Sequence, residues 1–221
     1  MSVWALLVAA GTGERLGEER PKAFVRLGEL PLLAEPLRRL EDSGWIDAIV
    51  IAVPAGWEEP TILLAEELSA TKVVAAVTGG ATRAESVRTA LAEVPEDVAV
   101  ALVHDAARPL LTEDLIERVL APLSDGWDGV VPVLPLTDTV KRVRDGAIVE
   151  TVDRTGLYAV QTPQAFLAPV LRRAYAGDLA GATDCAALVE AAGGRVTVVE
   201  GEPRLLKVTT TADLELVASW L

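Results

Sequence analysis

The chain alternates short apolar runs with segments whose apolar residues recur at helical spacing. Five apolar runs predict strands buried on both faces, at residues 3–9, 47–53, 72–77, 98–103 and 129–134. The segments between them predict helices, at residues 30–44, 56–70, 81–94 and 112–123. Repeated strand–helix–strand units with continuous apolar strands indicate a parallel sheet covered by helices on both faces. With right-handed crossovers, the predicted fold class is α/β, with a doubly wound, mostly parallel sheet.

The pattern changes after residue 135. Residues 137–156 alternate branched and charged side chains around Asp145-Gly146, which is a strong signal for a β-hairpin. Both faces of this hairpin are polar, and a lone two-stranded hairpin is only marginally stable in water. We therefore expect a projecting hairpin arm at about residues 135–160 that packs on a partner subunit. A flexible surface flap is the alternative.

The last third of the chain has weaker patterns. Residues 157–178 and 183–194 are expected to be mainly helical, and residues 195–210 to form two short strands, the second of them "RLLKV". A final helix follows, with Thr210 or Thr211 as its N-cap. Because no repeat or low-complexity linker interrupts the chain, residues 1–221 are expected to form a single domain with one arm.

Composition narrows the class of protein. Hydrophobic residues make up 51 % of the chain and charged residues 24 %, which indicates a packed core. No apolar run reaches the roughly 20 residues of a membrane span, and the first one indicates a buried strand rather than a signal peptide. The single Cys185 cannot form an internal disulfide, which favours a cytoplasmic location, and with the single His104 it excludes a His/Cys zinc cluster. A formal net charge of −13 disfavours nucleic-acid binding, although a local basic cluster can still bind a small anion.

The first strand runs into the glycine-rich segment "AAGTGERLGEERPKAF", residues 9–24. Its glycines fit neither of two common phosphate-binding motifs. A dinucleotide fingerprint needs its third glycine where the chain has Leu16, and an acidic residue at the end of the second strand, which instead ends in Val53-Pro54. The Gly-x-x-x-x-Gly-Lys-Ser/Thr pattern of a P-loop occurs nowhere in the sequence.

An extended loop that wraps a triphosphate is a third interpretation. Glycines let main-chain N–H groups approach phosphate oxygens closely. Arg15 offers a planar pair of donors and Lys22 a compact charge, and both can stabilise charge on a phosphoryl group in transfer. The alternative is a glycine-rich surface turn with solvated charges.

Further motifs follow in a fixed order: "GGATRAESV" at 79–87, "VHDAARP" at 103–109, "DTVKR" at 138–142, "TVDRTGLYAVQTPQAF" at 151–166 and "LLKVTTTADL" at 205–214. Together with the first loop they resemble the 2-C-methyl-D-erythritol 4-phosphate cytidylyltransferase family over essentially the whole chain. The resemblance implies a Rossmann-like nucleotidyltransferase sandwich. It also implies transfer of CMP from CTP to 2-C-methyl-D-erythritol 4-phosphate, giving 4-diphosphocytidyl-2-C-methyl-D-erythritol and pyrophosphate for non-mevalonate isoprenoid biosynthesis.

Asp105 is the candidate metal ligand, because a carboxylate at the carboxyl end of a strand can hold Mg²⁺ beside the nucleotide phosphates. A helix N-cap or turn aspartate is the alternative. The expected catalytic set is Arg15, Lys22 and Asp105. His104 is expected to be structural, because the attacking phosphate is already anionic and needs no general base.

The resemblance also assigns binding residues. Cytosine is expected to lie against the first loop and the 79–87 motif, at Ala9, Ala10, Gly11, Gly80, Ala81 and Ser86. At Ala81 the chain departs from the family, which often has a polar or acidic residue there. Arg83 is expected to brace this loop or to lie on an exposed helix face. The residues expected around the acceptor phosphate are Arg108, Thr139, Arg154, Thr162 and Lys207, with Arg154 supplied by the neighbouring subunit of a homodimer.

Three rival functions remain open on the sequence. The nearest is a cytidylyltransferase for ribitol 5-phosphate or another polyol phosphate, which would share the first loop and "HDAARP". A sugar-phosphate nucleotidyltransferase that uses another base is more distant. A non-catalytic nucleotide-binding subunit belongs to a different class, and the joint presence of Arg15, Lys22 and Asp105 speaks against it.

Overall fold

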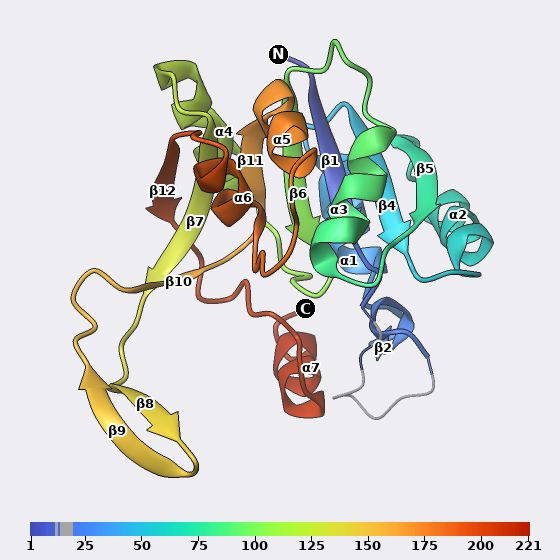
Figure 1. The fold of residues 1–221 in the computed structure, drawn as a ribbon. Helices are drawn as coiled ribbons and strands as arrows, with labels where there is room; N and C mark the ends of the chain where they lie inside the picture. Colours follow the sequence, from blue (N-terminus) through green and yellow to red (C-terminus); the bar gives the residue numbers. More distant parts are fainter. Residues whose placement is uncertain (12, 14–19) are drawn as a thin grey trace.

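A central sheet of eight strands organises the molecule (Figure 1). The structure is a computed structural model that describes residues 1–11, 13 and 20–221. The strands follow the order β10-β7-β11-β6-β1-β4-β5, and β12 pairs with β7. Their bounds are β1 Val3–Val8, β4 Ala48–Val53, β5 Val73–Thr78, β6 Val100–Asp105, β7 Gly129–Pro135, β10 Tyr158–Val160, β11 Gln164–Leu167 and β12 Val196–Glu200.

The five strands expected from the apolar runs are present and run parallel. β1 pairs in parallel with β4 and β6, and β4 pairs in parallel with β5. β11 runs antiparallel to both β6 and β7, so the sheet is mostly but not wholly parallel. Since every residue of β4 and β6 is buried, these strands need apolar side chains on both faces, which explains the unbroken apolar sequence of β4 and of Val100–Val103 in β6.

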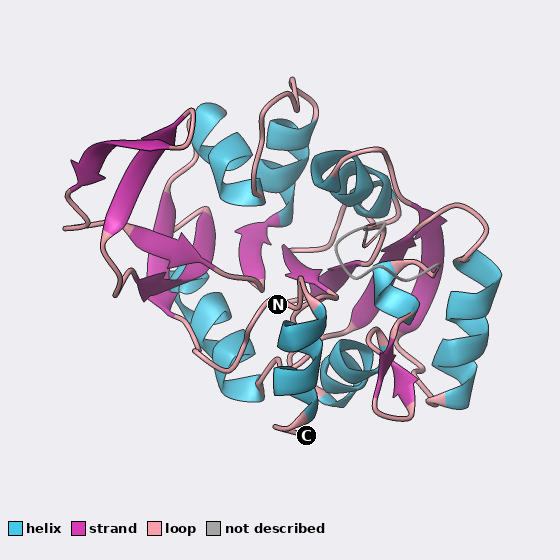
Figure 2. Ribbon diagram, turned by 90° about the horizontal axis from the view of Figure 1, so that it is seen from below, coloured by secondary structure: helices cyan, strands magenta, loops and turns pink. Residues whose placement is uncertain are grey.

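Helices cover both faces of the sheet, as Figure 2 shows from below. The first face is covered by α1 Ala34–Asp42, α2 Glu58–Glu67 and α4 Glu113–Leu120, and the second by α3 Arg83–Ala92, α5 Ala168–Tyr175 and α6 Cys185–Ala191. Neighbouring strand residues alternate between the two cores: Leu7 packs into the first and Leu6 into the second. This arrangement is the doubly wound α/β sandwich expected from the pattern.

Two expectations for the last third of the chain are wrong. Residues 157–167 were expected to be helical but form β10 and β11, whose Tyr158, Val160 and Phe166 are typical strand residues. The segment "RLLKV" was expected to be a strand but has no regular structure. Its main chain is instead hydrogen-bonded to the loop after β6, because Val208 N–H donates to the carbonyl of Ala107 at 2.8 Å.

A separate two-stranded sheet projects from the body of the molecule, at the lower left of Figure 1. It consists of β8 Val140–Arg144 and β9 Ala147–Val152, paired antiparallel. Asp145 and Gly146 both adopt positive φ angles at its turn, where glycine and aspartate are favoured. Most of this sheet is exposed, including Val143 and Ile148.

A small third core ties the end of the described chain to its beginning. It joins Val217 of α7, Thr211–Ala218, to Val208 and to Leu27 and Leu32, which lie in and beside the short pair β2 Arg26–Leu27 and β3 Leu30–Pro31. A capping box between Thr210 and Asp213 starts α7. The segments that carry Lys22 and Lys207 are therefore packed on one helix.

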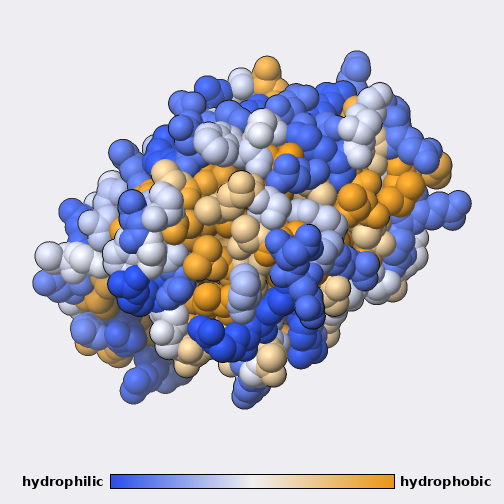
Figure 3. Space-filling model, turned by 90° about the horizontal axis from the view of Figure 1, so that it is seen from above, coloured by the Kyte–Doolittle hydropathy of each residue, from blue (hydrophilic) through white to orange (hydrophobic). Residues whose placement is uncertain are grey.

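None of the helices in the described part of the chain is both long and apolar enough to cross a membrane. The strands point towards the end of the sheet seen in Figure 2, so their carboxyl ends, with the loops that follow them, lie there. Figure 3 shows the opposite end, where hydrophilic side chains surround scattered apolar ones.

Candidate active site

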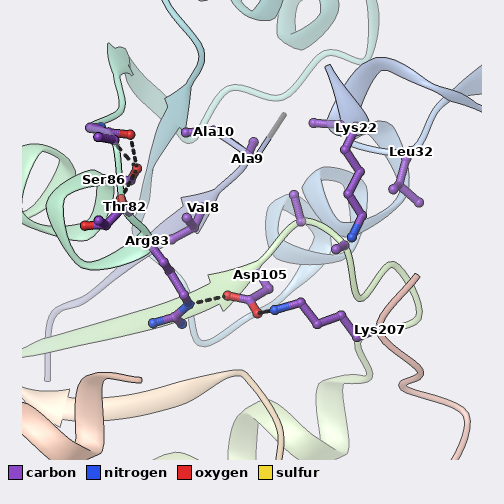
Figure 4. A pocket seen from close by; sticks show the side chains of 16 residues that line it. Val8, Ala9, Ala10, Lys22, Leu32, Thr82, Arg83, Ser86, Asp105 and Lys207 are labelled. Atoms are coloured by element: carbon purple, nitrogen blue, oxygen red, sulfur yellow. Dashed lines mark hydrogen bonds and ion pairs between the residues drawn. The ribbon is translucent and has the colours of Figure 1, made fainter. Parts of the chain in front are cut away.

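A cavity of about 360 Å³ opens at the carboxyl ends of β1 and β6 (Figure 4). We call it the first pocket. All six residues expected to bind the base line it, namely Ala9, Ala10, Gly11, Gly80, Ala81 and Ser86. Ala9 to Gly11 continue β1, the 79–82 segment connects β5 to α3, and Ser86 lies in the first turn of α3. These six residues therefore give their part of the wall main chain and side chains no bigger than serine, whereas larger side chains such as Lys22, Asp105 and Lys207 line other parts.

Two glycines allow the wall to close around this pocket. A Cβ on Gly79 would collide with the Cβ of Ala10, and a Cβ on Gly80 would collide with that of Glu85. Ser86 then fixes the segment, since its hydroxyl accepts from Gly80 N–H at 3.1 Å and donates to the carbonyl of Thr82 at 2.9 Å. The shape of the pocket is thus set by backbone contacts that other residue types would break.

Asp105, the last residue of β6, lies in the wall of the first pocket and is buried. Its Oδ1 atom accepts from Arg83 Nε at 2.8 Å, and its Oδ2 atom from Lys207 Nζ at 2.7 Å, as Figure 4 shows. Burial alone would raise the pKa of Asp105, but the charges of Arg83 and Lys207 hold it well below its usual range. The carboxylate is therefore ionised at neutral pH.

Lys22 enters the same pocket from the other end of the first loop (Figure 4). It follows Pro21 in a short 3₁₀ turn, Lys22–Phe24, and a Cβ on Gly13 would collide with its Cβ. Gly13 has a positive φ of 75° and lets the two ends of the loop approach each other. The structure therefore brings Lys22 and Asp105 to one cavity, whereas Arg15 lies outside the described residues.

A second pocket of about 250 Å³ adjoins the first. Arg83, Asp105 and Lys207 line both pockets, so their ion pairs form the wall between them. The residues that line only the second pocket are Arg108, Val160, Gln161, Thr162, Gln164, Thr183 and Asp184. The second pocket is consequently built from polar and charged side chains.

Two buried guanidinium N–H groups beside this second pocket are unsatisfied. Within the described residues, Arg83 Nη2 and Arg108 Nε have no hydrogen-bond partner. Other N–H groups of Arg108 donate to the carbonyls of Leu205 and Val160, at 2.9 and 3.4 Å. A buried cationic donor without a partner is costly, and an anion in the pocket would satisfy it.

A buried hydrogen-bonded chain stands behind the second pocket. His104 Nε2 lies 2.9 Å from the carbonyl of Arg108, so this nitrogen carries the proton and His104 Nδ1 accepts from the Thr162 hydroxyl at 3.2 Å. Thr162 Oγ1 in turn accepts from Asp105 N–H at 3.0 Å. Burial lowers the pKa of His104 to about 4, so the ring is neutral at neutral pH. His104 thus aligns main chain, in keeping with the structural role expected of it.

Thr139 and Arg154 line neither pocket of their own chain. Both are exposed, Thr139 just before β8 and Arg154 just after β9, where it donates to the carbonyl of Thr137. The remaining expected acceptor residues, Arg108, Thr162 and Lys207, line the second pocket together. The structure therefore divides the expected acceptor set into residues at the pocket and residues at the base of the β8–β9 sheet.

The donor set was tested for a divalent cation. Among the described residues, no group of three or more His, Cys, Asp or Glu side chains gathers as a metal site. Of the residues that the structure describes, Asp105 alone supplies a carboxylate at the first pocket. Mg²⁺ is commonly held by one or two carboxylates together with substrate phosphates and water. Asp105 fits such a shared site, although its oxygens are bound by Arg83 and Lys207.

Some site residues were not expected from the sequence. Arg83 neither braces its own loop nor lies exposed, because it crosses to Asp105 from the first turn of α3. Gln161, Gln164 and Asp184 of the second pocket were missed. The expected topology did indicate that Arg83 and Asp105 lie near each other. Arg83 closely follows β5, Asp105 ends β6, and both strands end at the same edge of the sheet.

Comparisons with known proteins agree with this geometry. The family model described as IspD, 2-C-methyl-D-erythritol 4-phosphate cytidylyltransferase, matches residues 3–221. The chain is 48 % identical to the Nocardia farcinica protein of that name, over 100 % of this chain and 94 % of the relative.

Solved structures of similarly named enzymes resemble this chain over nearly its whole length. The 2-C-methyl-D-erythritol 4-phosphate cytidylyltransferase of Thermus thermophilus superposes with a TM-score of 0.79 at 33 % identity, covering 97 % of this chain and 96 % of that one. The 4-diphosphocytidyl-2C-methyl-D-erythritol synthase of Anaerococcus prevotii gives a TM-score of 0.84 at 25 % identity, covering 99 % and 97 % of the two chains.

Proposed function

We propose a reaction course from the premise that this chain belongs to the 2-C-methyl-D-erythritol 4-phosphate cytidylyltransferase family. The chain is a nucleotidyltransferase of isoprenoid biosynthesis that transfers CMP from CTP to 2-C-methyl-D-erythritol 4-phosphate. The products are 4-diphosphocytidyl-2-C-methyl-D-erythritol and pyrophosphate. The observation that carries the proposed course is the ion-paired Asp105, which lies between a pocket lined partly by main chain and small side chains and a second pocket lined mainly by polar and charged side chains.

CTP occupies the first pocket in this proposal. Cytosine lies against Ala9–Gly11 and Gly80, where fixed main-chain groups can form hydrogen bonds and exclude bases that would leave polar groups unpaired. The triphosphate follows the first loop towards Lys22. Arg15 is proposed to act on the same triphosphate, as the family motif implies.

The acceptor occupies the second pocket, where its phosphate is bound by Arg108, Lys207 and the unsatisfied Arg83 N–H. A phosphate oxygen of the acceptor attacks the α-phosphorus of CTP. The new P–O bond forms as the bond to the bridging oxygen of pyrophosphate breaks, and that oxygen leaves with the electron pair. Lys22 stabilises the charge that develops on the triphosphate, so catalysis is mainly positioning and charge stabilisation.

Mg²⁺ is the proposed cofactor, with Asp105 as the residue that would hold it. When bound, it would neutralise charge on the nucleotide phosphates. His104 takes no proton in this scheme, because the attacking phosphate monoester is already anionic near neutral pH. Both ring nitrogens of His104 are also hydrogen-bonded, to Thr162 and to the carbonyl of Arg108.

A homodimer completes the acceptor site in this proposal. Thr139 and Arg154 lie at the base of the exposed β8–β9 sheet and away from both pockets of their own chain, so we place them at the second pocket of a partner subunit. A mixture of Arg154→Ala and Asp105→Asn proteins tests this. Each alone should be nearly inactive. A hybrid dimer has one of its two sites intact, so the mixture, in which about half of the dimers become hybrids after exchange of subunits, should recover about a quarter of wild-type activity. An inactive mixture that contains hybrids would contradict the shared site.

Pyrophosphate release tests the reaction itself. Purified protein is given Mg²⁺, one nucleotide from CTP, UTP, GTP and ATP, and one acceptor from 2-C-methyl-D-erythritol 4-phosphate and ribitol 5-phosphate. Release is expected with CTP and the methylerythritol phosphate. Preference for ribitol 5-phosphate would support a cytidylyltransferase for another polyol phosphate. Preference for another nucleotide would support a sugar-phosphate nucleotidyltransferase that uses another base. Absence of release with every pair would leave only a non-catalytic nucleotide-binding protein. We also expect a cytoplasmic location, as the single Cys185 suits a reducing compartment.

A further inference from the structure

Asp105 has two cationic partners that differ in freedom. Arg83 begins α3, its guanidinium also donates to the sulfur of Cys185 at 3.4 Å, and its side chain is 22 % exposed. Lys207 lies in an irregular segment, and its side chain is 41 % exposed. Arg83 is therefore a fixed partner of the carboxylate, whereas Lys207 reaches it through a flexible stem from the surface.

The position of Lys207 sets up a competition. The two carboxylate oxygens are used separately, Oδ1 by Arg83 and Oδ2 by Lys207. If Asp105 is to ligate a divalent cation that accompanies a triphosphate through Oδ2, whose partner Lys207 is the more exposed of the two cations, that oxygen must serve both the divalent cation and the ammonium. Two cations that share one carboxylate oxygen repel each other, and the Lys207 ammonium is the one that can move.

The second pocket offers Lys207 an alternative partner. Lys207 lines both pockets, and in the second it faces the same space as Arg108. An acceptor phosphate there would bind an ammonium through a charge-assisted hydrogen bond. The same short movement would therefore relieve the repulsion in the first pocket and supply a ligand in the second.

We propose that Lys207 is an exchangeable cation that couples the two pockets. It neutralises Asp105 in the empty enzyme and moves to the acceptor phosphate when the carboxylate turns to the metal of a bound nucleotide. This inference rests on the proposed function, since it requires a metal–nucleotide complex in the first pocket and a phosphate in the second. Because coupling is reciprocal, the nucleotide complex strengthens binding of the acceptor, and the acceptor strengthens binding of the metal–nucleotide complex.

Lys207→Met should change the two affinities in opposite directions. Calorimetry with α,β-methylene CTP, which cannot release pyrophosphate, measures the Mg²⁺ concentration for half-saturation and the dissociation constant of 2-C-methyl-D-erythritol 4-phosphate. Without the competing ammonium, the Mg²⁺ requirement should fall about 2- to 5-fold, the scale of a partly exposed ion pair. Binding of the acceptor to the nucleotide complex should weaken about 10- to 100-fold, the scale of a hydrogen bond to a charged group. The coupling between the two ligands should shrink accordingly.

The opposite changes in the two affinities distinguish exchange of Lys207 from a general distortion of the site. A distorted site would weaken both ligands, and that outcome overturns the proposal, as does an unchanged Mg²⁺ requirement. Arg88→Met is the matched control, because it removes one positive charge from the exposed surface of α3 and should change neither constant. Lys207→Gln repeats the test with a neutral polar side chain, so a folding defect in one variant does not decide the result. Pyrophosphate release by the wild type tests the proposed function separately, and the Mg²⁺ measurement needs no acceptor.

Discussion

The two pockets meet at Asp105, yet they are built from different material. Apart from the charged residues that it shares with the second and from Lys22, the first is walled mainly by main chain and small side chains, among them Ala9 to Gly11 and Gly80 to Ala81. The second is walled by side chains that carry charge or hydrogen bonds, among them Arg108 and Asp184. A main-chain wall recognises the shape and hydrogen-bonding edge of a neutral ring, whereas a wall of guanidinium and ammonium groups recognises an anion.

This difference determines how each pocket responds to mutation. The first pocket should be sensitive to added volume, because Gly79 and Gly80 leave no room for a Cβ. The second should be sensitive to loss of charge, because its donors are buried and partly unsatisfied. Lys22 in the first pocket and Lys207 between the two pockets should affect turnover and coupling rather than the affinity of one ligand alone.

The largest effect is expected for Lys22→Ala, which removes a positive charge from the first pocket. Turnover should fall about 100- to 1,000-fold, as when one preorganised donor to a developing charge is lost. The free energy of unfolding should change by less than about 1 kcal/mol. Steady-state kinetics and urea unfolding of the same preparation measure both, with Arg20→Ala in the same loop as the control. Equal turnover in Lys22→Ala and the wild type would remove Lys22 from the mechanism.

Lowering the pH should destabilise the folded protein through His104, which lies behind the second pocket. The folded pKa of His104 is about 4 and its ordinary value is 6.5, so between these pH values the unfolded chain binds a proton that the folded one excludes. Stability is therefore unaffected above pH 6.5 and decreases as the pH falls towards 4, on the order of 3 kcal/mol in total.

Urea unfolding of the wild type and His104→Asn from pH 7 to 4.5 measures this loss. The variant should be less stable at pH 7 and should lose less stability on acidification, and equal slopes would contradict the assignment. Asp105 contributes little change over this range, since its lowered folded pKa keeps its stabilisation in place until the pH falls below its ordinary value of 3.8.

Arg108→Met sharpens the contrast by removing charge from the second pocket alone. The KM for the acceptor should rise about 10- to 100-fold, the range for a lost hydrogen bond to a charged group. The KM for CTP should stay within about twofold of the wild type, because Arg108 does not line the first pocket. Arg118→Met is the control, because Arg118 is a half-buried arginine on α4 that lines neither pocket. A matching rise in both KM values would show that the two pockets are not separable.

Gly80→Ala tests the first pocket with the smallest change. The new methyl group would collide with the Cβ of Glu85, and overpacking of this kind costs about 1–3 kcal/mol, so the KM for CTP should rise roughly 10-fold. The acceptor KM should be nearly unchanged. Gly44→Ala is the matched control, because the nearest atom to its new Cβ is 3.8 Å away. If Gly80→Ala raises only the acceptor KM, the assignment of the pockets is reversed.

Much of the fold follows from local patterns in the sequence. Buried strands such as Ala48–Val53 appear in the sequence as continuous apolar runs. Thr210, one of the two expected N-caps, begins α7 and forms a capping box with Asp213. The misassigned residues 157–167 show the limit of this approach. β10 and β11 are three and four residues long, too short for a period to be read, and their pairing with β7 and β6 is a tertiary contact.

The site was less predictable than the fold. Lys22, Asp105 and Lys207 were expected near phosphate, and the structure places all three at the first pocket. Their partners could not be read from the sequence, because Arg83 and Asp105 are 22 positions apart and belong to different structural units. The unsatisfied N–H groups of Arg83 and Arg108 exist only once the surrounding residues are packed.

The small core on α7 has a consequence for biosynthesis. Val217 packs with Leu27 and Val208, so this part of the support for the segments that carry Lys22 and Lys207 forms only when residues translated some 190 positions after Leu27 have emerged from the ribosome. Nascent chains fold from the amino terminus as they are made. One wall of the first pocket, although it begins among the first residues to be synthesised, would therefore be completed among the last.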